Sequence, residues 1–194
     1  MWKKGKMKNI VVLIVLACNI ISVECQASNQ VPVNVALGKP IFADLTCGFE
    51  ESETFIDHNQ LYLDQKIIQV CKRGDHPASS MVDGNSSSFW QSTSRPILLE
   101  NEYNTVLGGE FINITINLEQ IFEIDEIIIS MGSSPRPGNL MVEKSDDGVV
   151  YSPWVYNVEI DNTCTQDYRT PILQDLQDVN DVTDVLCYTY HNAA

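Results

Sequence analysis

The alternation in Gly109–Leu118 (GEFINITINL) is the feature that most restricts what this chain can fold into. An isoleucine or leucine stands at every second position from Ile112 to Leu118, and mainly Asn and Thr stand between them. Period two with β-branched residues is typical of a strand that buries one face. The segment therefore predicts a half-buried strand against a hydrophobic core.

Further segments extend this β pattern. Ile124–Ile129 ends in three consecutive isoleucines, so we expect a strand that is covered on both faces. Leu140–Ser145 is expected as another strand, and the Asp-Gly pair at 147–148 predicts a hairpin turn before Val149–Tyr151. Short antiparallel strands in one domain without internal repeats close most naturally as a two-layer sandwich. The predicted fold class is all-β.

No convincing long amphipathic helix is present in the region expected to fold. Polar connections that contain Pro and Gly separate the strands, for example His76–Ser94 and Ser133–Gly138. The acidic stretch Gln174–Asp184 carries an apolar residue at every third position, which fits a short helix and a solvated loop equally well. Its structure stays unassigned at this point.

The first 25 residues have the pattern of an export leader. Four lysines between positions 3 and 8 precede an apolar run from Ile10 to Val23. A basic segment followed by an apolar run of this length is typical of a signal peptide, and a membrane-spanning helix needs about 20 apolar residues. We therefore expect a signal peptide at residues 1–25, a mature start near Gln26, one domain over 26–194, and secretion without a transmembrane anchor.

The charge of the chain limits its partners. The whole sequence carries a formal charge of −14, and loss of residues 1–25 with four lysines and one glutamate leaves 8 basic and 25 acidic side chains, or −17. Such a surface repels nucleic acid, so no nucleic-acid partner is expected. It suits cations such as calcium or basic partners, although an acidic surface also serves simply to keep a domain soluble.

Four cysteines follow the expected leader: Cys47, Cys71, Cys164 and Cys187. An even number in an exported chain predicts two disulfides. Counting alone leaves three connectivities, of which the two local loops, Cys47 to Cys71 and Cys164 to Cys187, are the simplest. A zinc site is not expected, because there is no CxxC pair and no histidine falls at metal-ligand spacing.

Two tripeptides fit the acceptor pattern for N-glycosylation, and they begin at Asn85 and Asn113. Asn113 falls on the polar side of the predicted strand, and Asn85 follows Asp83-Gly84 in a turn, so both are expected to be accessible. Chance occurrence is the alternative, since such tripeptides are frequent.

Arg73-Gly74-Asp75 spells the tripeptide that integrins read on some matrix proteins. A guanidinium and a carboxylate that a glycine turn holds apart can bridge an acidic and a metal-bearing receptor site, provided that the loop is exposed and tight. Chance occurrence is again the alternative explanation.

The segment Asp83–Ser92 (DGNSSSFWQS) combines a turn rich in oxygen donors with a large aromatic residue. Calcium prefers oxygen ligands from short loops, so a calcium site at Asp83 is one hypothesis. The other is that Trp90 plugs the core and the loop is structural. The EF-hand, GxSxG, Walker and zinc-protease patterns are absent, so the chain is expected to bind and not to catalyse.

Six stretches follow one another over nearly all of the expected mature chain: NVALGKP (34–40), TCG (46–48), HPASSMVDGNSSSFWQS (76–92), ITINLEQIF (114–122), SPRPG (134–138) and VEKSDDGVVYSPWVY (142–156). Taken in this order, they resemble the motifs of laminin N-terminal domains. The stretches SPRPGN and SPW look more like alpha chains than beta chains, gamma chains or netrins.

This resemblance implies a jelly-roll β-sandwich of the galactose-binding or discoidin type. It also implies a place in basement membranes, where alpha, beta and gamma N-terminal domains meet in a calcium-dependent network. Integrin and glycan receptors are further candidate partners, which the Arg73-Gly74-Asp75 tripeptide and the discoidin-like alternative suggest. Carried over by position, the calcium ligands are the Asp83 carboxylate, a main-chain carbonyl near Ser80, and Ser88.

The sequence departs from the family pattern in two ways. One pair of cysteines is missing between Cys47 and the HP segment, as if one disulfide were dropped. The family's domain normally continues past the cysteine that matches Cys187, so the jelly roll is expected to be incomplete at its C-terminal end. The alternatives are a stand-alone discoidin-like adhesive or glycan-binding module, and a guidance cue of netrin type.

Overall fold

The computed structural model describes residues 5–14, 18–25, 33–57, 67–93, 111–124, 126–131, 137–173 and 184–189. The expected mature start near Gln26 and residues 174–183 of the acidic stretch lie outside these ranges.

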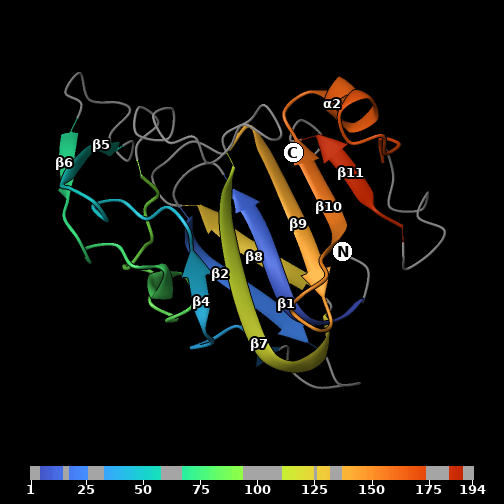
Figure 1. The fold of residues 1–194 in the computed structure, drawn as a ribbon, viewed down its shortest axis with the longest axis horizontal. Helices are drawn as coiled ribbons and strands as arrows, with labels where there is room; N and C mark the ends of the chain where they lie inside the picture. Colours follow the sequence, from blue (N-terminus) through green and yellow to red (C-terminus); the bar gives the residue numbers. More distant parts are fainter. Residues whose placement is uncertain are drawn as a thin grey trace.

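The strands of the described chain form a six-stranded sheet, a three-stranded sheet and a separate hairpin (Figure 1). All ladders are antiparallel except that between β10 and β11. The large sheet has the order β11 (Leu186–Thr189), β10 (Ser152–Val158), β9 (Asn139–Ser145), β1 (Gly5–Ile14), β7 (Ile112–Ile124), β4 (Ile41–Ala43). The second sheet has the order β3 (Val33–Asn34), β2 (Cys18–Cys25), β8 (Glu126–Met131), and the hairpin is β5 (Glu53–Asp57) with β6 (Ile67–Cys71).

The core lies between the two sheets, so the all-β sandwich prediction is confirmed. Ile112, Ile114, Ile116 and Leu118 of β7 are fully buried, whereas Asn113 and Asn117 are exposed, as the alternation predicts. They form one cluster with side chains of β8, β9 and β10, among them Ile127, Val142 and Trp154. Helical structure in the described chain is limited to the 3₁₀ turn η2 (Ala78–Met81) and the short helix α2 (Asp161–Gln166).

Two details of the strand prediction are wrong. The isoleucine run was expected to be covered on both faces, but Ile128 is 40% exposed between the buried Ile127 and the half-buried Ile129. The cause is that β8 belongs to an antiparallel sheet of a two-layer sandwich, in which one face meets the core and the other meets solvent.

The hairpin after β9 is wider than the Asp-Gly pair predicts, because β10 begins at Ser152 and not at Val149. The carboxylate of Asp147 accepts the backbone N–H groups of Val149 (2.8 Å) and Val150 (2.9 Å) and so stabilises a longer turn. Val149 and Val150 consequently project into solvent.

The residues expected as an export leader form two strands in this structure of the whole chain. β1 lies between β9 and β7 in the large sheet, and β2 lies between β3 and β8 in the second sheet (Figure 1). An apolar run rich in valine and isoleucine suits the core of a leader and also has a high β propensity. Cleavage of residues 1–25 stays a prediction.

Both disulfides have the simplest of the three connectivities. Cys47 pairs with Cys71 at the end of β6, and Cys164 of α2 pairs with Cys187 of β11. Among the described residues, no helix has the length and apolar character that a membrane crossing requires.

Candidate functional site

The loop that begins at Asp83 is held at both ends by the core. Val82 is buried, and its carbonyl accepts the N–H of Gly38 at 2.7 Å. Trp90 is fully buried, and its indole N–H donates to the Thr46 hydroxyl at 2.9 Å. The tryptophan therefore plugs the core, as one reading of the sequence predicts, and residues 83–89 form a loop of fixed span between two anchors.

Inside this loop, oxygen atoms gather around the Ser88 hydroxyl. The Asp83 carboxylate accepts the backbone N–H of Asn85 at 2.8 Å and the Ser88 hydroxyl at 2.7 Å. The Ser88 Oγ also lies 2.9 Å from the Asn85 carbonyl oxygen and 3.5 Å from the Ser80 carbonyl oxygen. The structure thus brings together the three residues that the resemblance implies as calcium ligands, and it adds Asn85.

The Asp83 carboxylate is fully exposed, and its charged form is favoured. Its pKa lies below the usual value, first because of the hydrogen bond from Ser88 and then because of the backbone N–H of Asn85. One carboxylate, two carbonyls and one hydroxyl are all hard oxygen ligands of the kind that calcium accepts, and water molecules would complete its six to eight ligands. Where the structure is described, no three His, Cys, Asp or Glu side chains are grouped to hold a metal.

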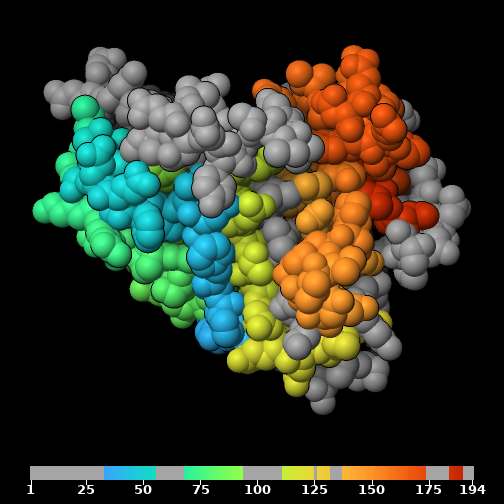
Figure 2. All heavy atoms as spheres, in the orientation of Figure 1, coloured from blue at the N-terminus to red at the C-terminus, as the bar shows by residue number. Residues whose placement is uncertain are grey.

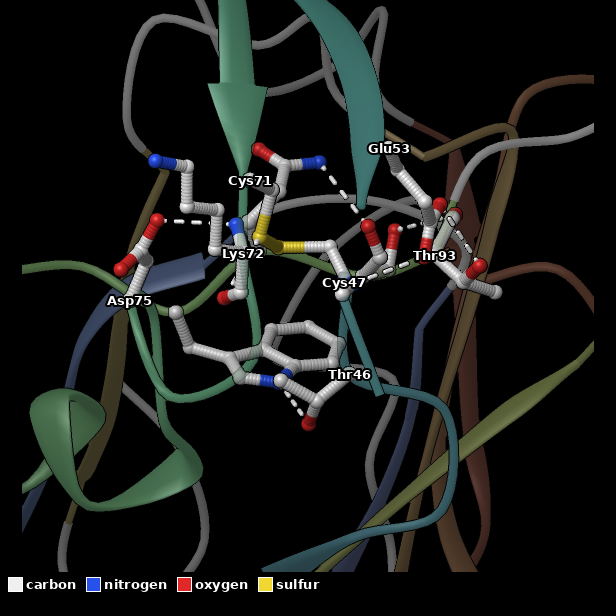
Figure 3. The surroundings of a disulfide bond; sticks show 11 residues. Thr46, Cys47, Glu53, Cys71, Lys72, Asp75 and Thr93 are labelled. Carbon is white, nitrogen blue, oxygen red and sulfur yellow. Dashed lines mark hydrogen bonds between the residues drawn. A yellow bond between two sulfur atoms is a disulfide. The ribbon is translucent and has the colours of Figure 1, made fainter. Parts of the chain in front are cut away.

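The segment that the Cys47–Cys71 disulfide closes contains a buried carboxylate, that of Glu53, which sequence reasoning missed (Figure 3). Glu53 is only 8% exposed, and its two oxygens accept the Gly48 N–H and the Thr93 hydroxyl, each at 2.8 Å. The segment ESETF contains two glutamates, and no sequence signal distinguished the buried Glu53 from its exposed neighbour Glu51. Through its bond with Thr93, Glu53 holds the start of β5 against the segment that follows Trp90.

The tripeptide Arg73-Gly74-Asp75 lies in an exposed turn directly after this disulfide (Figure 3). Gly74 has φ +89°, which favours glycine. The Asp75 carboxylate accepts the Lys72 N–H at 2.8 Å, and the Asp75 N–H donates to the Lys72 carbonyl at 3.0 Å. The guanidinium of Arg73 lies 5.5 Å from the ring centre of Phe49, in the segment after Cys47. Asp75 is thus bonded within its own turn, whereas Arg73 contacts a neighbouring segment.

An aromatic group also flanks the Asp83 loop. The rings of His76 and Phe89 stack with their centres 4.1 Å apart, and Phe55 of β5 meets both rings edge-on. All three rings are half-buried. Sequence reasoning missed this contact, because Phe55 lies far from the other two in the chain. Figure 2 shows these segments, coloured cyan to green, gathered at one side of the molecule.

Both glycosylation acceptors are exposed. The side-chain oxygen of Asn85 accepts the Ser87 N–H at 3.0 Å. The side-chain nitrogen of Asn113 donates to the Asp44 carboxylate at 2.7 Å, and burial raises the pKa of that carboxyl. Attachment of glycans to either residue stays a prediction.

Comparison with known proteins gives the family. The family model described as Laminin N-terminal (Domain VI) matches residues 29–194. The chain is 28% identical to human laminin subunit alpha-1 over 96% of its own length, and 32% identical to the laminin subunit alpha of Drosophila melanogaster over 87% of it. Human laminin subunit alpha-3 is 34% identical over 62% of the chain.

The chain spans 6%, 5% and 3% of the lengths of these three relatives. They are laminin subunits and not enzymes, which agrees with the prediction of a non-catalytic protein. The fold, the order of motifs and the matched residues agree with one another, and the chain belongs to the laminin N-terminal (domain VI) family.

Proposed function

We propose that this chain acts outside the cell as the N-terminal domain of an alpha-type laminin chain. In this role it is secreted into the basement membrane and joins the N-terminal domains of beta and gamma chains in a calcium-dependent network. Family membership and similarity to laminin alpha subunits support the matrix role. The acidic surface expected after loss of the leader, with a formal charge of −17, suits a cation-dependent contact.

One observation carries the calcium part of this proposal: the Ser88 hydroxyl lies within hydrogen-bonding distance of both the Asp83 carboxylate and the Ser80 carbonyl. Calcium bound here would neutralise the Asp83 carboxylate and link it to the neighbouring carbonyl oxygens. Because Val82 and Trp90 already fix the ends of the loop, little conformational entropy would be lost on binding. Asp83, Ser80, Ser88 and Asn85 would hold the ion.

The test is a calcium titration of thermal stability. Wild-type protein should gain thermal stability with added calcium, because a ligand that binds only the folded state stabilises it. Asp83→Asn should remove this gain, while Asp146→Asn, an exposed aspartate elsewhere on the surface, should keep it. An unchanged wild-type midpoint across the titration would show that the loop binds no calcium and is purely structural.

Receptor contact is the second part of the proposal. The Arg73-Gly74-Asp75 turn is exposed and fixed by the adjacent disulfide, which favours an integrin contact. The Lys72 N–H already donates to Oδ2 of Asp75 and would compete with a receptor's metal ion for the carboxylate, so we expect weak affinity. Asp75→Glu should abolish adhesion of integrin-bearing cells to the immobilised protein. Adhesion that survives this change but is lost on competition with soluble glycans would favour a glycan receptor.

A further inference from the structure

The outer face of the large sheet carries a glycan acceptor beside β4. Asn113 of β7 lies next to Asp44, the residue that follows β4, and both side chains are exposed. The side chains of these strands that point inward, such as Ile114 and Ala43, pack in the core. Figure 2 shows β4 (blue) beside β7 (yellow-green) on the visible face of the molecule. A glycan on Asn113 therefore starts on the solvent side of the sheet, within reach of β4.

Asp44 holds the amide group to which a glycan would be attached. One of its carboxylate oxygens accepts the Asn113 backbone N–H at 3.0 Å, and the other accepts the side-chain Nδ2–H at 2.7 Å. Nδ2 carries two hydrogens, of which the sugar replaces one. The remaining N–H can keep the bond to Asp44, so the first sugar is tied to a nitrogen of fixed position. Little conformational freedom is then left to lose when that sugar contacts the sheet.

Two phenylalanines stand on either side of this attachment point. Phe42 of β4 is 64% exposed and pairs with Thr115, which lies two positions after Asn113. Phe42 is therefore a diagonal neighbour of Asn113 on the same face, at a distance of about 7–8 Å that aromatic side chains can span. Phe111 stands two positions before Asn113, where the strand alternation brings a side chain to the same face, and it is half-buried. The acceptor nitrogen thus lies between two aromatic residues.

The chemistry of the first sugar matches this surface. An N-acetylglucosamine ring presents C–H bonds on its faces, and weakly positive hydrogens are attracted to the negative face of an aromatic ring. Stacking of the two also removes apolar surface from water. In the described chain β4 is the last strand of the large sheet, and a hydrophilic group that covers an exposed edge hinders its pairing with another chain.

We propose that the surface of β4 and β7 between Phe42 and Phe111 binds the first N-acetylglucosamine of a glycan attached to Asn113 of the same chain, and that this contact stabilises the edge of the large sheet. The inference rests on the proposed secretion, and it is independent of calcium and of the laminin partners. The other acceptor, Asn85, provides a contrast, because the residue two positions before it is Asp83 and not a phenylalanine.

The test compares the same sequence with and without its sugar. Ser87→Ala removes the acceptor motif of Asn85, so that Asn113 alone is modified. This variant is secreted from eukaryotic cells and trimmed to one N-acetylglucosamine, and it is also exported to a bacterial periplasm, where disulfides form but these motifs stay unmodified. The sugar should raise the thermal midpoint by about 2–4 °C, the size expected for a contact as strong as an aromatic pair. Phe42→Ala and Phe111→Ala, each made in both forms, should remove most of this gain.

Thr115→Val is the matched control, because it removes the motif of Asn113 and leaves the Asn85 glycan in place. The effect of that remaining glycan on the midpoint should not depend on Phe42. A second readout needs no sugar-free protein: the NMR signal of the acetyl methyl group on the Asn113 sugar should move upfield through the ring currents. In Phe42→Ala and Phe111→Ala the signal should return toward its value in a free sugar.

An equal gain with and without the two rings, or an acetyl signal that already has the free-sugar value in the parent protein, would overturn the proposal. Secreted protein in which Asn113 is unmodified would also overturn it. An unmodified product found in the cytosol would overturn both this inference and the proposed secretion, which distinguishes the two failures.

Discussion

The hydroxyl of Ser88 donates to the carboxylate of Asp83 at 2.7 Å, and this contact closes the loop that the calcium proposal depends on. It is also the first cause of the lowered Asp83 pKa. This one hydrogen bond therefore closes the loop and also favours the charged form of the Asp83 carboxylate.

Ser88→Ala should raise the Asp83 pKa toward its usual value, because the charged form loses its strongest hydrogen bond. A carboxyl with a depressed pKa in the folded state adds stability above its unfolded pKa, and this contribution is lost as pH falls through the folded value. The stability difference between wild type and S88A should thus shrink below the folded pKa. NMR titration of the Asp83 carboxyl measures the shift, and an identical titration curve in S88A would contradict it.

Gly48→Ala should be severely destabilising. A Cβ atom at Gly48 would lie 2.5 Å from the Lys72 carbonyl carbon, and the position has φ +69°. Gly38→Ala is the matched control, because Gly38 has φ +68° with open space around it and carries the conformational cost alone, about 1 kcal/mol. Chemical denaturation should show a clearly larger loss for G48A, and equal losses would mean that the close approach to Lys72 does not matter.

Glu53→Gln should lower the free energy of unfolding by about 1–3 kcal/mol. The amide keeps the size of the side chain but replaces one acceptor oxygen with a donor, which cannot accept the bond from Gly48 or from Thr93. Glu51→Gln changes an exposed neighbour and should have almost no effect. Urea denaturation of both variants measures the difference, and equal stabilities would show that the buried carboxylate contributes nothing.

Intact-mass analysis of secreted protein should show the loss of residues 1–25, no free thiols and two N-glycans. Cleavage removes Cys18 and Cys25, and the remaining four cysteines are paired in the structure. Glycans are expected at Asn85 and Asn113, which are both exposed. Retention of the first 25 residues in a cytosolic product would contradict the extracellular proposal.

The sequence predicted those features that follow from local periodicity. The alternation from Ile112 to Leu118 was sufficient for β7 and its buried face, because a strand with one face in the core must repeat every two residues. Whether a sheet is covered on one face or on both depends on the layers of the fold and not on the strand itself, so the exposure of Ile128 was not predictable from its isoleucine neighbours.

The candidate site was predictable in part. Asp83, Ser80 and Ser88 came from the family resemblance, and the structure brings them together. Glu53 and the Phe55 contact with His76 depend on pairings between segments distant in sequence, which periodicity does not reveal. The role of residues 5–25 was ambiguous for a physical reason: one apolar run satisfies both a leader and a central strand.

The most direct test of the proposed function is sedimentation velocity of the secreted chain mixed with beta and gamma laminin N-terminal domains, with calcium and with a chelator. The proposal predicts a ternary complex in calcium, its dissociation in the chelator, and loss of the complex for Asp83→Asn but not for Asp146→Asn. A complex that forms equally well in the chelator, or no complex of the wild-type chain in calcium, would contradict a calcium-dependent role in network assembly.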